Sequence, residues 1–345
     1  MITEKPVCVT GASGFIAAHI VRELLALGYK VTGTVRKNPW EYPFLLNLPG
    51  AHERLKLEKA DLLEEGSFDK VVAGCEYVIH TASPFEMNVK DPQTDLVDPA
   101  VNGTESVLGS CMKAGSIKRV ILTSSIAAMT DEPESSKVYN EKDWNTMSSL
   151  DRNPYYYSKT LAERAAWDFI MQKKPGFDLV VINPFLVLGP SLGPSLSTSC
   201  ETIRDMMAGV YPAIMDINWG IVDVRDVASA HILAMEKAEA SGRYLCSGDA
   251  LHMREIVELL KTSRCKKHSL PRIDLTGKTG SAIIKGLSMT KPKNIGKYIR
   301  THVGRTLCYD NSKIRRELGI SFIPAKTSVI ETVEDLMKWG HLKNS

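Results

Sequence analysis

The chain has 345 residues, of which 43% are hydrophobic and 24% charged, as expected for a folded globular protein of about two domains. The formal net charge of +3 is small, which argues against nucleic acid or a membrane surface as a partner. The seven scattered cysteines form no Cys-x-x-Cys pair, so we expect neither a disulfide framework nor a metal site. No apolar run has the length of a membrane span, and the first predicted strand begins close to Met1. We therefore expect no leader peptide and a cytoplasmic location.

The first elements are a strand at residues 6–10, a glycine-rich turn and a helix, which together form half of a dinucleotide-binding βαβ unit. Gly11 allows a sharp turn, and Gly14 allows the backbone to approach a pyrophosphate, which would lie at the helix N-terminus. Ala17 stands at the third glycine position and is small enough for helix–strand packing. We expect the cofactor to contact Gly11, Ser13, Gly14, Phe15 and Ile16.

A second strand is predicted at residues 30–35, and its end selects between two cofactors. An NAD site usually has a carboxylate here to bind the ribose hydroxyl, whereas the 2′-phosphate of NADP requires a cation. This position has Arg36 and Lys37 and no acidic residue. The pair could be two solvated surface charges, but after the glycine-rich turn it favours NADP(H), with Arg36 on the 2′-phosphate.

The next two strands, at residues 55–59 and 77–80, end in further candidate cofactor contacts. After the first come Asp61 and Leu62, where Asp61 could contact the adenine edge or cap a helix over residues 64–72. After the second come small residues, which suit a crevice for a flat cofactor. These are Thr81, Ala82 and Ser83. We expect His80, which closes an apolar strand, to be a packed core residue.

A helix at 98–113 and a strand at 119–123 complete five strands that alternate with helices. This order predicts an α/β fold with a doubly wound parallel sheet of the Rossmann type. The fifth strand ends at Ser124 and Ser125, at the sheet edge where such folds bind ligands.

A helix from Tyr155 to about residue 171 carries the remaining candidate chemistry. Tyr155 and Lys159 are four residues apart, so their side chains lie on one helix face. A nearby ammonium group lowers the pKa of a phenol, which eases proton exchange with a substrate oxygen. The alternative is an aromatic helix start with a surface lysine. The combination with the glycine-rich turn and Ser125 favours a catalytic role.

The chain then leaves the large sheet. A strand at 178–182 leads to Pro184, which cannot continue a hydrogen-bonded ladder, and the apolar residues that follow, such as Val187, suit a wall for a nicotinamide ring. The later predictions are a loop at 191–199, a strand and helix at 220–235, a last strand at 242–246, a helix at 253–260, a loop at 269–304, and helices at 311–318 and 329–339.

These predictions divide the chain into two parts. Residues 1–184 and about 218–248 would form the NADP(H)-binding Rossmann domain. Residues about 185–217 and 249–345 would form a smaller C-terminal α/β subdomain that binds the substrate.

Together the motifs resemble the extended short-chain dehydrogenase/reductase family, and within it the branch of dihydroflavonol, cinnamoyl-CoA and yeast methylglyoxal (aldehyde/ketone) reductases. The resemblance spans nearly the whole chain. It rests on Thr10-Gly-Ala-Ser-Gly-Phe-Ile16, Asp61-Leu62, His80-Thr-Ala-Ser-Pro84, Asn102-Gly-Thr104, Thr123-Ser-Ser125, Tyr155-x-x-Ser-Lys159, Asn183-Pro184, Val222-Asp-Val-Arg-Asp-Val227 and Asp310-Asn-Ser-Lys313.

The resemblance implies an NADPH-dependent carbonyl reductase, a monomer or homodimer, that converts a small aldehyde or ketone to an alcohol. It implies that Ser125 binds the carbonyl oxygen, that Tyr155 donates the proton, and that Lys159 holds the nicotinamide ribose. One motif departs from the plant cinnamoyl-CoA reductases, because Asn153-Pro-Tyr-Tyr-Tyr157 replaces Asn-Trp-Tyr-Cys-Tyr, which argues against a CoA thioester substrate.

The same residues leave other functions open. A dihydroflavonol-type reductase, a hydroxysteroid dehydrogenase and a nucleotide-sugar epimerase share this fold and the Ser/Tyr/Lys set. A non-catalytic NADP(H)-sensing protein is a further alternative, although such a protein has little reason to retain all three side chains.

Overall fold

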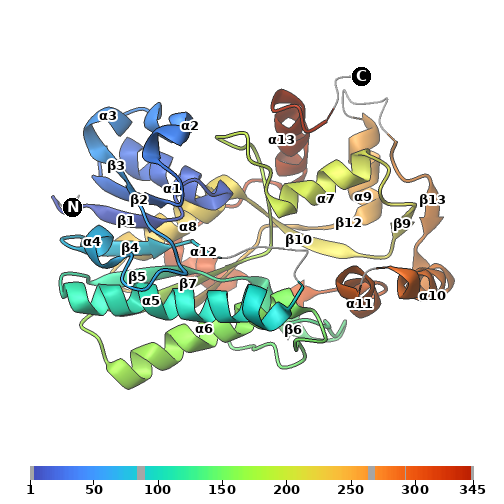
Figure 1. The fold of residues 1–345 in the computed structure, drawn as a ribbon. Helices are drawn as coiled ribbons and strands as arrows, with labels where there is room; N and C mark the ends of the chain where they lie inside the picture. The colour runs from blue at the N-terminus through green and yellow to red at the C-terminus, as the bar shows by residue number, and fades with distance from the viewer. Residues whose placement is uncertain (1–3, 84–89, 263–268, 292, 343–345) are drawn as a thin grey trace.

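The computed structural model describes residues 4–83, 90–262, 269–291 and 293–342. Its centre is a seven-stranded parallel sheet with the strand order β11-β7-β5-β4-β1-β2-β3 (Figure 1). The strands are β1 (Val7–Thr10), β2 (Val31–Val35), β3 (Leu55–Lys59), β4 (Tyr77–His80), β5 (Arg119–Thr123), β7 (Asp178–Pro184) and β11 (Gly242–Cys246). The predicted Rossmann fold is confirmed.

Helices cover both faces of this sheet, and each face has its own apolar core. Successive strand residues point to opposite faces, so that Val78 of β4 packs in one core and Ile79 in the other. One face packs against α1 (Phe15–Ala26), α8 (Val224–Glu236) and α12 (Ser312–Leu318), with α2 (Pro43–Leu46) and α3 (Ala51–Arg54) adding to the same core. The other face packs against α4 (Asp69–Val72), α5 (Asp98–Ala114) and α6 (Pro154–Lys173).

A second group of elements has a separate core. Its strands form a three-stranded sheet, β12 (Ala250–His252), β10 (Asn218–Asp223) and β8 (Leu186–Leu188), and the pair β9 (Ala213–Met215) with β13 (Ile273–Leu275). A further short pair, β6 (Val138–Tyr139) with β14 (Cys308–Tyr309), lies outside this core, and its Tyr309 packs in a small cluster with Leu245 of β11. Its helices are α7 (Thr198–Met207), α9 (Met253–Thr262), α10 (Gly277–Leu287), α11 (Lys293–His302) and α13 (Ala325–Lys338). Figure 1 shows this group beside the carboxyl ends of the large sheet.

The division into two domains stays a prediction. Two elements make contacts across the predicted boundary between these domains. β10, which the division assigns to the Rossmann part, pairs with β8 and β12 of the second group. α12, which the division assigns to the C-terminal part, packs in the core of the large sheet through Ile314 and Leu318.

Three predicted elements differ from the structure. The helix predicted over 64–72 is only the short α4, because Gly66 has a φ of +74° and the chain before α4 is a series of turns. The strand at 242–246 is not the last, because β12, β13 and β14 follow it. The segment 269–304 is not a loop: it contains β13, α10 and α11.

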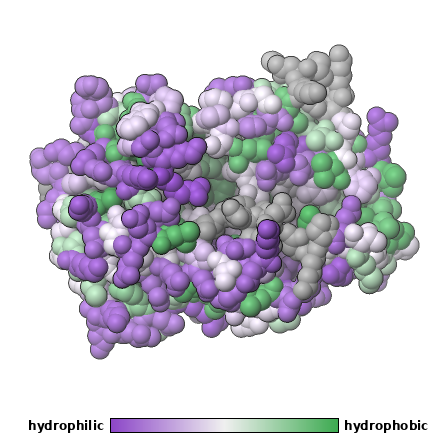
Figure 2. All heavy atoms as spheres, in the orientation of Figure 1, coloured by the Kyte–Doolittle hydropathy of each residue, from purple (hydrophilic) through white to green (hydrophobic). Residues whose placement is uncertain are grey.

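Part of the molecular surface is apolar. Figure 2 shows apolar side chains at the edge of the molecule near β13 and α10, where Ile273, Leu287 and Met289 are exposed. Of the helices in the described ranges, none combines the length and apolar character needed to cross a bilayer.

Candidate active site and cofactor cradle

The glycine-rich turn is held tightly between two strands. Gly11 has a φ of +65°, and a Cβ atom there would lie 3.1 Å from the Cα of Ala82, so a larger residue would be both strained and crowded. The Gly11 N–H donates to Oγ1 of Thr34 at 2.9 Å, and the Gly14 N–H donates to the Gly11 carbonyl at 2.8 Å. The turn is therefore fixed against the end of β2 and the segment after β4.

Helix α1 begins directly after this turn, and its N-terminus fits an anionic group. Gly14 is the N-cap, and no side chain caps the helix, so side chains leave the first N–H groups free to bind an anion. Ala17 is buried, which agrees with its packing role. Ser13 to Ile16 lie at this N-terminus. The backbone geometry thus fits the pyrophosphate that the sequence predicts.

The candidate adenosine contacts lie at the ends of β2 and β3. Arg36 and Lys37 are exposed, and the Lys37 ammonium lies 3.9 Å from a Glu41 carboxylate oxygen. Asp61 accepts a hydrogen bond at 3.0 Å from the N–H of residue 63, so it caps a local turn. Leu62 packs against α5 at Gly103. A contact between Asp61 and an adenine ring stays a prediction.

The segment after β4 is organised by Thr10. The N–H groups of Thr81 and Ala82 both donate to the Thr10 hydroxyl oxygen at 3.1 Å. That hydroxyl lies 2.8 Å from Nδ1 of His80, to which it can donate. His80 is 1% exposed, and burial lowers its pKa to about 3. His80 is therefore a neutral, packed residue, as the sequence analysis expects.

The three candidate catalytic residues meet at the carboxyl edge of the sheet. Tyr155 and Lys159 lie one turn apart on α6, with the Lys159 ammonium 5.9 Å from the centre of the Tyr155 ring. The Tyr155 hydroxyl shares a hydrogen bond with Ser125, which follows β5. Lys159 Nζ donates to Oγ of Ser83, after β4, at 2.9 Å. Residues far apart in sequence thus form one polar cluster.

The pKa values of this pair differ from the sequence-based expectation. The sequence predicts that Lys159 lowers the pKa of Tyr155, whereas burial raises this pKa to about 12, with a partial offset from the hydrogen bond to Ser125. Burial also lowers the pKa of Lys159 to about 8. Both shifts have one cause, because a poorly solvated site disfavours the charged form of each group. At neutral pH Tyr155 is therefore protonated, which is the form that can donate a proton.

A buried ion pair beneath the cluster was missed by the sequence analysis. Glu163 of α6 lies 2.5 Å from the guanidinium of Arg243, and both side chains are buried. Glu163 also accepts hydrogen bonds from Ser124 at 2.5 Å and from the amide of Asn183 at 2.7 Å. The same amide donates to the Ser125 carbonyl at 3.1 Å. This network fixes the backbone at Ser125.

The two remaining candidate residues lie where the chain passes between sheets. Pro184 is the last residue of β7 and pairs with Cys246 of β11. Val187 lies in β8 and is 5% exposed. β7 thus runs two residues beyond the predicted end at 182, and the chain leaves the large sheet after Pro184.

Comparison with known proteins extends these observations. The model of the NAD dependent epimerase/dehydratase family matches residues 7–246. The chain is 43% identical over 338 residues to cinnamoyl-CoA reductase CAD2 of Medicago truncatula, covering 96% of this chain and 95% of that protein. It is 38% identical to tetraketide alpha-pyrone reductase 1 of Arabidopsis thaliana, with coverage of 97% and 96%.

A solved structure supports the same relationship. The yeast methylglyoxal/isovaleraldehyde reductase Gre2, complexed with NADPH, superposes with a TM-score of 0.82 at 32% identity, covering 97% of this chain and 99% of that one. The chain therefore belongs to the NAD dependent epimerase/dehydratase family, in the branch of the extended short-chain dehydrogenases/reductases that contains these reductases.

Proposed function

We propose that this protein reduces the carbonyl group of a small molecule to an alcohol with NADPH, and that Tyr155 donates the proton. The observation that carries the proposal is the convergence of Ser125, Tyr155 and Lys159 beside the glycine-rich turn. The protein is an NADP-dependent oxidoreductase, since its relatives are reductases and the similar yeast enzyme is complexed with NADPH.

NADPH supplies the hydride in this reaction. Its pyrophosphate would bind the turn at Gly11 and the N-terminus of α1, and its 2′-phosphate would bind the Arg36 guanidinium. Lys159 would hold the nicotinamide ribose. The remaining proposed cofactor contacts are Ser13, Gly14, Phe15, Ile16, Lys37, Asp61, Leu62, Thr81, Ala82, Ser83, Tyr155, Pro184 and Val187.

The protein's own contribution is to bind the carbonyl oxygen and to move one proton. The hydroxyl groups of Ser125 and Tyr155 lie within hydrogen-bonding distance of one another, and each carries one O–H donor. A carbonyl oxygen that enters between them can accept from both when the hydrogen bond between the two hydroxyls is exchanged for two hydrogen bonds to that oxygen. Tyr155 then gives its proton to that oxygen as the alcohol forms. The positive charge of Lys159 stabilises the phenolate that remains. Such proton donation typically contributes about 10²- to 10⁴-fold in rate.

A CoA thioester is a second candidate substrate. The 43% identity to a cinnamoyl-CoA reductase over nearly the full length favours it. The replacement at Asn153 to Tyr157 of the motif typical of the plant enzymes argues for a simple aldehyde or ketone instead. We therefore rank the aldehyde or ketone first.

The experiment that tests this function is a substrate panel monitored by the ultraviolet absorbance of NADPH. The panel contains small aldehydes, α-diketones, β-ketoesters, dihydroflavonols and a hydroxycinnamoyl-CoA, each assayed with NADPH and with NADH. A nucleotide sugar is incubated in parallel and checked for conversion to its epimer. We expect oxidation of NADPH with at least one carbonyl compound. Interconversion of nucleotide sugars without net NADPH oxidation would instead indicate an epimerase, and binding of NADPH without any turnover would indicate a sensing protein.

A further inference from the structure

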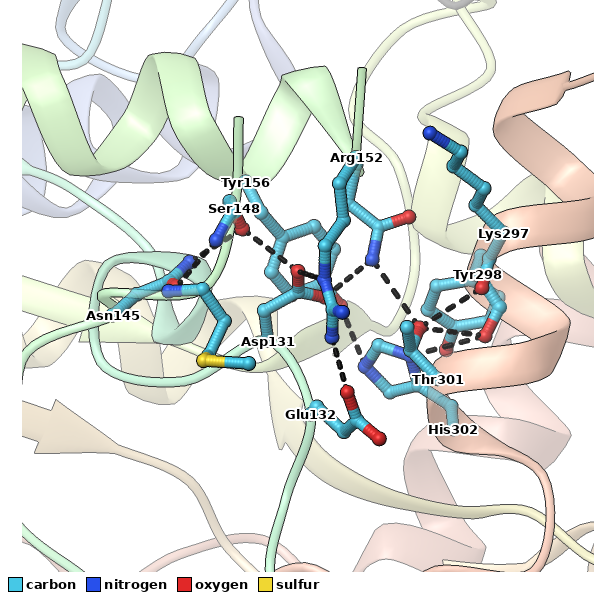
Figure 3. Close-up of polar contacts among 12 residues, drawn as sticks. Asp131, Glu132, Asn145, Ser148, Arg152, Tyr156, Lys297, Tyr298, Thr301 and His302 are labelled. Carbon is cyan, nitrogen blue, oxygen red and sulfur yellow. Dashed lines mark hydrogen bonds and ion pairs between the residues drawn. The ribbon is translucent and has the colours of Figure 1, made fainter. Parts of the chain in front are cut away.

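Helix α11 of the second group of elements lies against the first turn of α6, where Tyr155 is located. Figure 3 shows α11 on one side of the view, with Thr301 and His302 pointing toward the start of α6 and toward Asp131. Two separate contacts join the helices. One runs through the N-cap residue of α6, and the other through the residue next to Tyr155.

The first contact runs through Asn153, the N-cap of α6. Asn153 has a φ of +48°, a left-handed conformation that a residue with a Cβ atom adopts only when its surroundings hold it. Its side-chain amide donates to the buried carboxylate of Asp131 and, at 3.2 Å, to the Thr301 hydroxyl. Asp131 also accepts hydrogen bonds from Arg152 at 3.2 Å and Ser148 at 2.9 Å (Figure 3).

The second contact joins His302 to Tyr156. His302 Nδ1 lies 3.1 Å from the carbonyl of Tyr298, which can only accept, and 2.9 Å from the Thr301 hydroxyl, which can donate or accept. A proton on Nδ1 is the arrangement that is compatible with both neighbours. Nε2 is then an acceptor, and the Tyr156 hydroxyl donates to it at 3.4 Å. The His302 ring stacks on Tyr298 with 4.1 Å between centroids. The Tyr156 ring in turn meets Tyr155 edge to face at 6.1 Å.

These two contacts bracket Tyr155 in the sequence. Residue 153 is held to Thr301, and residue 156 is held to His302. A displacement of α11 would therefore move the backbone on both sides of Tyr155.

We propose that α11 is a positioning element for the reaction, in which Thr301 and His302 hold the first turn of α6 so that the Tyr155 hydroxyl is aligned with Ser125. Thr301 and His302 act through Asn153 and Tyr156 and touch neither substrate nor cofactor in this role. This inference rests on the proposed function, because it assumes that Tyr155 is the proton donor.

The test uses Thr301→Val, which removes the hydroxyl at nearly constant volume, and His302→Phe, which keeps a stacking ring and removes the acceptor. We expect each to lower kcat for the preferred carbonyl substrate about 10-fold or more, which corresponds to ~1.4 kcal/mol. The dissociation constant for NADPH should stay within about threefold. The solvent isotope effect on kcat should rise, because proton transfer from a misaligned Tyr155 becomes slower than the other steps.

Thr262→Val is the matched control. The Thr301 hydroxyl donates to the carbonyl of Tyr298, three residues earlier in α11, at 3.0 Å. Thr262 makes the same kind of hydrogen bond to the carbonyl of Leu259 at 2.8 Å, but it is exposed at the end of α9. The kcat and the solvent isotope effect of Thr262→Val should match those of the wild type. Thr301→Ser keeps the hydroxyl and should retain most of the wild-type kcat, which separates the hydrogen bond from general packing.

Two results would overturn the inference. One is a wild-type kcat and isotope effect in both Thr301→Val and His302→Phe with NADPH binding intact. The other is a loss of activity in Thr301→Ser that equals the loss in Thr301→Val. Because the serine variant keeps the hydroxyl, its loss of activity would count against the inference even if the valine variant folded poorly. Failure of the proposed function looks different, because Tyr155→Phe would then retain turnover.

Discussion

Lys159 donates a hydrogen bond from Nζ to Oγ of Ser83 at 2.9 Å, which ties the helix carrying Tyr155 to the carboxyl end of β4. Thr81 and Ala82, which precede Ser83, are held by Thr10 at the end of β1. The position of Lys159 is thus defined by the same sheet edge that holds the glycine-rich turn. The charged form of Lys159, however, is disfavoured by burial, which lowers the pKa of its ammonium group to about 8.

The pH dependence of reduction follows from this shift. Lys159 is charged below its pKa and neutral above it, so its support for the Tyr155 phenolate disappears as pH rises through about 8. We expect kcat/KM for reduction to fall across this range, measured as a pH–rate profile. In Lys159→Arg the guanidinium stays charged, so the fall should vanish from the profile even if the maximal rate is lower. If kcat/KM fell in the same way in the wild type and in Lys159→Arg, the titrating group would be a residue other than Lys159.

Cofactor selection should depend on Arg36. Loss of a hydrogen bond to a charged phosphate costs about 1.5–3 kcal/mol, so Arg36→Ala should lower kcat/KM with NADPH roughly 10- to 100-fold and leave the value with NADH nearly unchanged. Lys30→Ala is the control, because Lys30 is an exposed cation just before the opposite end of the same strand. Equal losses with both cofactors in Arg36→Ala would contradict a role in 2′-phosphate recognition.

Stability should depend on Glu163. Glu163→Gln would leave the buried Arg243 guanidinium without its carboxylate, and breaking a buried pair in this way costs about 3–5 kcal/mol. Urea unfolding should show this loss in the free energy of unfolding. The control is Glu58→Gln, whose partner Lys56 is exposed, and its free energy of unfolding should stay close to the wild-type value. A similarly small loss in Glu163→Gln would mean that the buried network adds little stability.

The large sheet was predictable from sequence because its strands are short apolar runs between clear turn signals. The strands at 55–59, 77–80 and 119–123 have the predicted bounds. Since parallel strands end at one edge, the candidate residues that follow β4 and β5, Ser83 and Ser125, could be expected near one another before any contact was known.

Other features depend on tertiary packing that a local pattern does not reveal. Helix α10 contains Gly280 and Gly286, which lower helix propensity, and it forms because Ile284 packs in the second core. The role of Glu163 depends on Arg243, which lies 80 residues further along the chain. Its one local signal is the spacing of eight residues from Tyr155, which places an acidic residue on the same helix face.

The most direct test of the proposed function is the turnover of Tyr155→Phe with the carbonyl compound that the wild-type protein reduces best. The phenylalanine ring keeps the shape of the side chain and removes only the hydroxyl that donates the proton. We expect NADPH to bind with a wild-type dissociation constant and kcat to fall about 10²- to 10⁴-fold. A kcat within a few fold of the wild-type value, with NADPH bound normally, would contradict the assignment of Tyr155 as the proton donor.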